Sequence, residues 1–166
     1  MHITILRRLA SVATITLALG AHGLAANGRA HKLAGTINDY TAALDAGGPW
    51  HVSGEWSLTF EEDRGRANFS AALTMVRADN PARAAHTHHV TLEDAVAMPV
   101  ANGFHISAPA ALTSNGNLAG FSGSTVEILA TGGNAVSFSN VAVTFGGAAA
   151  AHFGDQPLHG VVTTER

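Results

Sequence analysis

The sequence has 166 residues, of which 9 are Lys or Arg, 12 are Asp or Glu and none is Cys, for a formal net charge of −3 at pH 7. A slightly acidic chain without a basic run argues against nucleic-acid binding and against electrostatic attachment to a membrane. The lack of cysteine excludes thiol chemistry and disulfide bonds, so an exported form must be stable through burial, with or without help from a metal ion.

The first 26 residues have the pattern of a secretory signal peptide. Arg7 and Arg8 precede an uncharged apolar run, residues 9–21, which is followed by small residues. This run is shorter than the stretch of about 20 residues that a helix needs to cross a bilayer. We therefore expect residues 1–26 to be removed on export. A single β domain, residues 27–166, would remain in the bacterial periplasm or be secreted, with no membrane anchor.

Only one segment of this domain predicts a helix, and that helix is short. In residues 37–47, Asp39 is placed to cap a helix and Gly47 to end it. We therefore expect at most one short helix, close to the N-terminal end of the domain.

Most of the remaining chain alternates between apolar and polar residues, which predicts strands. In residues 52–60 the apolar residues on one face are Val52, Trp56, Leu58 and Phe60. Residues 61–66 then predict an exposed hairpin connection. In the next strand the apolar face consists of Ala67, Phe69, Ala71, Leu73 and Met75. These two faces are the best candidates for the protein core.

The second half of the chain repeats this pattern after a polar turn at residues 77–83. Further strands are predicted within residues 84–94, 102–110, 124–131, 134–145 and 158–164. The pair Gly132–Gly133 favours a hairpin between two of them. The apolar phase changes near Asn140, which predicts a β-bulge there.

Seven or eight strands at short spacing, without recurrent helices, predict an all-β and mostly antiparallel fold. A single small antiparallel β-barrel is favoured, because closure leaves no exposed sheet edge; a β-sandwich is the alternative. Gly54-Glu55-Trp56 resembles the G-x-W on the first strand of lipocalins and avidin-like barrels, which implies that Trp56 closes one end of a barrel. Trp56 is therefore a candidate ligand-binding residue, and plain core packing is its alternative role.

Three histidines fall within four residues, at His86, His88 and His89. Side chains two apart on a strand lie on the same face, so His86 and His88 should share the apolar face of Val90 and Leu92. His89 should point the other way. The H-x-H spacing lets two imidazoles reach one metal ion, and a third ligand must then come from another part of the chain.

His152 and His159 are the best candidates for that further ligand. Both lie in residues 146–160, where many small residues allow close approach of another segment. Zinc commonly takes three protein ligands and keeps one position for water, and copper also accepts imidazoles. The sequence therefore predicts zinc or copper as cofactor, bound by residues from the set His86, His88, His152 and His159. A metal-free pocket lined by histidines remains the alternative.

Glu93 and His105 are candidates for contact with a bound ligand. His86, His88 and Glu93 resemble part of the cupin metal motif, although the flanking glycines and the second motif of that family are not matched here. His105 lies on the polar phase of its own strand, which makes it a weaker candidate as a metal ligand.

These patterns predict an exported small β-barrel protein with a histidine-lined pocket that binds a metal ion or a small molecule. An alternative is a small exported enzyme, hydrolase or lyase-like, whose histidines hold a metal-bound water or transfer protons. A structural domain without a site is the third alternative. The G-x-S-x-G nucleophile elbow, the Walker loop and the dinucleotide fingerprint are absent, and no catalytic residue is assigned.

Overall fold

The computed structural model describes residues 29–41, 49–82, 85–115, 121–132 and 137–166. The predicted signal segment lies outside these ranges. Within the described ranges, no helix has the length and apolar character needed to cross a membrane.

Almost all of the secondary structure is strand. The strands are β1 (Ala30–Tyr40), β2 (Trp50–Glu61), β3 (Arg66–Arg77), β4 (His86–Val100), β5 (Gly103–Pro109), β6 (Ala111–Ser114), β7 (Thr125–Thr131), β8 (Asn140–Gly146) and β9 (Leu158–Glu165). Between β8 and β9 the chain forms a 3-10 turn, η1 (Gly147–Ala149), and a single short helix, α1 (Ala150–Phe153).

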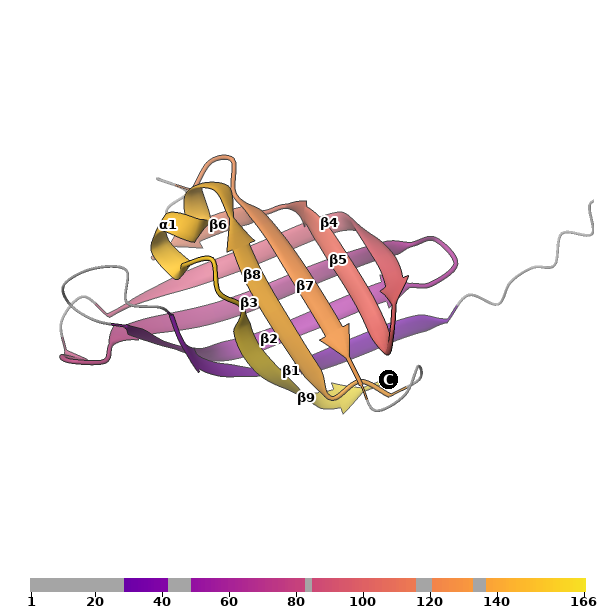
Figure 1. Ribbon diagram of the computed structural model, residues 1–166, viewed down its shortest axis with the longest axis horizontal. Helices are drawn as coiled ribbons and strands as arrows, with labels where there is room; N and C mark the ends of the chain where they lie inside the picture. Colours follow the sequence, from indigo (N-terminus) through magenta and orange to yellow (C-terminus); the bar gives the residue numbers. More distant parts are fainter. Residues whose placement is uncertain (1–28, 42–48, 83–84, 116–120, 133–136) are drawn as a thin grey trace, which may run out of the picture.

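The strands form a closed antiparallel barrel, as Figure 1 shows. The order is β3-β2-β1-β9-β8-β7-β5-β4, and β4 pairs with β3 to complete the circle. Strands that follow one another in the chain are therefore neighbours in the barrel, apart from β6. That short strand pairs with residues 88–91 of β4, beyond the part of β4 that pairs with β5. The prediction of a barrel is confirmed, and the sandwich alternative is excluded.

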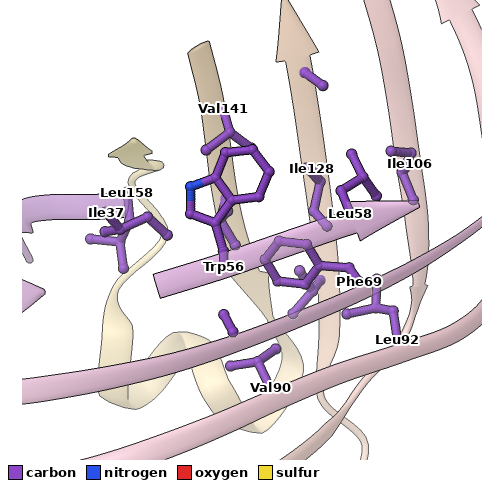
Figure 2. Packing of buried hydrophobic residues seen from close by; sticks show 14 of the residues in the cluster. Ile37, Trp56, Leu58, Phe69, Val90, Leu92, Ile106, Ile128, Val141 and Leu158 are labelled. Carbon is purple, nitrogen blue, oxygen red and sulfur yellow. The ribbon is translucent and has the colours of Figure 1, made fainter. Parts of the chain in front are cut away.

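The barrel interior is filled by the apolar faces that the alternation predicts. Every second residue of β3 from Ala67 to Met75 is buried, and the apolar residues of β2 between Val52 and Phe60 are buried with them. Figure 2 shows that side chains from β2 and β3 meet others from the opposite wall, on β5, β7 and β8. Full burial of one large apolar side chain contributes about 1.5–3 kcal/mol to stability.

Trp56 occupies part of this interior, and a glycine makes room for it. Gly35 of β1 pairs with Trp56 of β2. A Cβ atom on Gly35 would lie 2.9 Å from Cζ2 of the Trp56 indole and 1.8 Å from the carbonyl oxygen of Val161. A larger residue at position 35 would therefore push β1 and β9 apart.

The predicted helix at residues 37–47 is wrong in its first part. Residues 37–40 belong to β1, and residues 42–48 lie outside the described ranges. Ile37 is buried and pairs with Gly54 of β2, so sheet pairing overrides the local capping signal. The Asp39 carboxylate accepts hydrogen bonds from the backbone N–H groups of Tyr40 and His159.

The shift in apolar alternation near Asn140 is not caused by the predicted β-bulge. Phe138 and Val141 are both buried, but β8 begins only at Asn140. The change of phase therefore falls where the chain enters the strand, not within a continuous strand. Val136, one of the residues on which the predicted bulge was based, lies outside the described residues.

Candidate metal centre

Three histidine rings meet at one end of the barrel, and we call them the histidine cluster: His86, His88 and His152. The Nε2 atom of His152 lies 3.1 Å from Nε2 of His86 and 3.0 Å from Nε2 of His88. One ligand nitrogen from each residue lies within 4.8 Å of the others. Two of the rings come from β4 and the third comes from α1, so the cluster joins segments that are far apart in the sequence.

Strand β4 directs His86 and His88 inward through its pairing with β3. His86 lies opposite Met75 and His88 lies opposite Leu73, and both of these partners are buried core residues. The two imidazoles therefore continue rows of inward-facing side chains toward the end of the barrel. His88 is fully buried and His86 is half-buried. His89 is exposed, although its backbone pairs with β3 on one side and with β6 on the other.

Helix α1 places His152 over the same end of the barrel. Gly147 has a φ of 62°, and a Cβ atom there would lie 2.2 Å from the carbonyl oxygen of Gly123, so the turn that leaves β8 requires glycine. Phe153 is buried and stacks on Phe145 of β8, with ring centroids 4.0 Å apart. This stack attaches the short helix to the barrel and thereby fixes the position of His152, the neighbouring residue. Figure 1 shows α1 at the same end of the barrel as β6.

Strand β6 fixes the orientation of the His88 ring. The Nδ1–H group of His88 donates a hydrogen bond to the backbone carbonyl of Thr113 over 3.1 Å. Because a carbonyl can only accept, this bond places the proton on Nδ1 and leaves a lone pair on Nε2. When a histidine binds a metal ion through one ring nitrogen, the N–H of its other ring nitrogen commonly donates a hydrogen bond to a backbone carbonyl.

Hydrogen bonds among the three rings cannot satisfy all three Nε2 atoms at once. The Nε2 atom of His88 can only accept, and Nε2 of His152 carries at most one proton, yet it faces nitrogens of both other rings. A cation between the rings would accept all three lone pairs. Four tetrahedral ligands at zinc–nitrogen distances are about 3.3 Å from one another, close to the two short separations here.

Aromatic rings surround the cluster. The Trp50 ring lies edge-on to His86 at 5.2 Å between centroids, and Phe121 and Phe153 lie 5.4 Å and 4.9 Å from the His88 ring. Burial among these groups, together with the neighbouring His152 and His86 rings, lowers the pKa of His88 to about 4. Burial also lowers the pKa of His152, with a further contribution from His86. His88 is therefore neutral at neutral pH, which is the form that binds a metal ion.

His159, the other histidine predicted as a metal ligand, lies apart from the cluster. It is exposed on β9, where Leu158 takes the inward-facing position. Its Nδ1 atom lies 2.9 Å from a carboxylate oxygen of Asp39, which also accepts the backbone N–H of His159. Alternation along β9 therefore turns this histidine away from the barrel interior.

The three predicted ligand-binding residues also lie elsewhere. Trp56 is buried in the core near Phe69, and its Nε1 atom has no hydrogen-bond partner among the described residues. The Nε2 atom of His105 lies 3.5 Å from a carboxylate oxygen of Glu127, an exposed residue. Glu93 is exposed on β4, in the phase opposite to the inward-facing residues.

The sequence did not identify the aromatic rings around the cluster, from Trp50, Phe121 and Phe153, or the carbonyl of Thr113 that binds His88. The sequence does contain a signal for α1, because the alanines at 148–151 favour a helix. Gly154, with a φ of 87°, ends it. Phe121 and Thr113 carry no comparable local signal, since the pairing of β6 with β4 brings Thr113 next to His88 and only the tertiary fold brings Phe121 there. No family model, curated protein sequence or solved structure matches this chain.

Proposed function

We propose that this protein binds one divalent transition-metal ion through the Nε2 atoms of His86, His88 and His152. The observation that carries the proposal is the convergence of three imidazole nitrogens from β4 and α1 on one point. The buried carbonyl contact of His88 and the lowered pKa of two of the rings support it, because both keep lone pairs available for an ion.

Zinc is the expected ion and copper is the alternative. Imidazole ligands suit zinc, copper and nickel, whereas magnesium and calcium require oxygen ligands. In the part of the chain that the structure describes, the group of potential metal ligands at this site consists of histidines alone. Three protein ligands are also the usual number at zinc sites that keep one position open.

We further propose that the protein acts outside the bacterial cytoplasm. The support comes from the sequence: Arg7 and Arg8, the apolar run 9–21 and the small residues after it have the order of a secretory signal. A metal ion bound by histidines suits such a location, because the site needs no reduced thiol.

The test is metal analysis of the purified protein together with zinc titration by calorimetry. The unaltered protein should bind one zinc ion per chain, and His88→Ala and His152→Ala should each lose that binding. His89→Ala is the matched control, because it removes an exposed imidazole from the same strand, and His159→Ala removes the histidine bound to Asp39. Both controls should bind zinc as the unaltered protein does. Equal loss in His88→Ala and His89→Ala would contradict the proposal.

A further inference from the structure

We propose that the metal ion in the histidine cluster binds a small anion directly, as an exchangeable fourth ligand. This inference rests on the proposed metal site and adds the class of molecule that the site takes. The expected ligand is a compact anion with an atom that can donate a lone pair to the metal ion, such as azide or bicarbonate.

The first argument is charge. Three neutral imidazoles contribute no negative charge, so a divalent ion keeps its full charge of two. Among the described residues, no Asp or Glu joins the group of potential ligands. A carboxylate in place of one histidine would neutralise part of this charge, and the chain does not supply one from the described segments. The ion is therefore left to attract an anion from solution.

The second argument is the medium around the ion. The rings of Trp50, Phe121 and Phe153 line the cluster, and they offer no charge or strong hydrogen-bond acceptor to a cation. An uncompensated charge is costly in such surroundings, and attraction between opposite charges is stronger there than in water. Direct contact between the ion and an anion relieves this cost.

The third argument is access. His88 is fully buried, but His86 and His152 are each half-buried, so one side of the cluster is reached by solvent. Arg77 lies over the Trp50 ring at 5.7 Å, and its guanidinium group is paired with the Asp79 carboxylate at 2.9 Å. That pair is neutral as a whole, so the expected partner of the anion is the ion itself.

The experiment uses cobalt(II) in the purified protein, because the visible absorption of cobalt responds to its ligands. We expect cobalt bands in the unaltered protein and in His89→Ala, but not in His88→Ala. Addition of sodium azide should change the bands in a single saturating step. If the bands depend on His88 and azide leaves them unchanged, the metal site stands and the anion proposal is wrong. If cobalt bands do not depend on His88, both proposals are wrong.

A charge variant tests the physical reason. His86→Glu replaces a neutral ligand of the ion by a carboxylate, and the unaltered protein is the reference. We expect azide to bind cobalt-loaded His86→Glu at least about tenfold more weakly than the cobalt-loaded unaltered protein, because the carboxylate neutralises part of the ion's charge. Equal azide affinity in the two proteins would contradict the charge argument.

Discussion

His88 and His152 are 64 residues apart in the sequence, yet their Nε2 atoms lie 3.0 Å apart. The pair connects the barrel wall, through β4, to the short helix α1 that lies over the end of the barrel. An ion bound by both rings would therefore link β4 to α1, which is also attached to β8 by the packing of Phe153 on Phe145. Metal binding at the histidine cluster would therefore couple the position of α1 to the stability of the fold.

Zinc should raise the thermal stability of the protein, and this effect should depend on His88. A ligand that binds only the folded state at 100 times its Kd adds about 2.7 kcal/mol to the free energy of unfolding. Calorimetric scans with zinc and with excess chelator should show the higher Tm with zinc. His159→Ala should show the same rise, and His88→Ala should show none. A rise of equal size in His88→Ala would place the zinc elsewhere.

The metal-free protein should lose stability as the pH falls from about 6.5 to about 4. The pKa of His88 is about 4 in the folded state, against an ordinary histidine pKa of 6.5 in the unfolded chain, so the unfolded chain takes up the proton first. The free energy of unfolding therefore decreases across this range, by at most roughly 3 kcal/mol, and this group causes no further decrease below pH 4. Urea unfolding at several pH values, with chelator present, measures the effect.

The variant His88→Leu provides the control for this pH dependence. Leucine fills much of the same buried space and does not titrate, so the slope of stability against pH should be smaller in this variant. His152, whose pKa is also lowered, should keep part of the slope. A slope in His88→Leu identical to that of the unaltered protein would show that His88 does not cause it.

Phe153→Ala should weaken zinc binding although Phe153 is not a ligand. Loss of the stack on Phe145 removes the attachment of α1 and frees His152 from its position. Truncation of a buried phenylalanine also costs about 3–5 kcal/mol of stability. Phe69→Ala is the matched control, since Phe69 is equally buried but belongs to the barrel interior beside Trp56. Both variants should lose stability, and only Phe153→Ala should lose zinc affinity in a calorimetric titration.

The exported protein should begin between Ala26 and His31. This expectation follows from the basic, apolar and small-residue order of the first residues. Mass spectrometry of protein recovered from the periplasm or the medium of a bacterial culture measures the N-terminus. Recovery of an intact chain that begins at Met1 and stays in the inner membrane would contradict the signal assignment.

The inward-facing residues of β2 and β3, and the face shared by His86 and His88, could be predicted from the sequence, because the alternation of side chains along a strand is a local property of the backbone. The pattern placed Leu73 and Met75 on the core face, and it placed His86 and His88 on one face with His89 on the other. The count and spacing of the strands also favoured a barrel. None of these features depends on contacts between distant parts of the chain.

The choice of the distant histidine that joins His86 and His88 depends on the tertiary fold. His152 and His159 lie in the same stretch of small residues, and the sequence offers both. Gly147 and the stack of Phe153 on Phe145 turn α1 over the barrel end, whereas pairing of β9 with β1 and β8 directs His159 to the surface. Sheet pairing likewise made Ile37 part of a strand despite a local helix signal. These outcomes depend on contacts between residues far apart in the chain, and a periodic pattern carries no information about them.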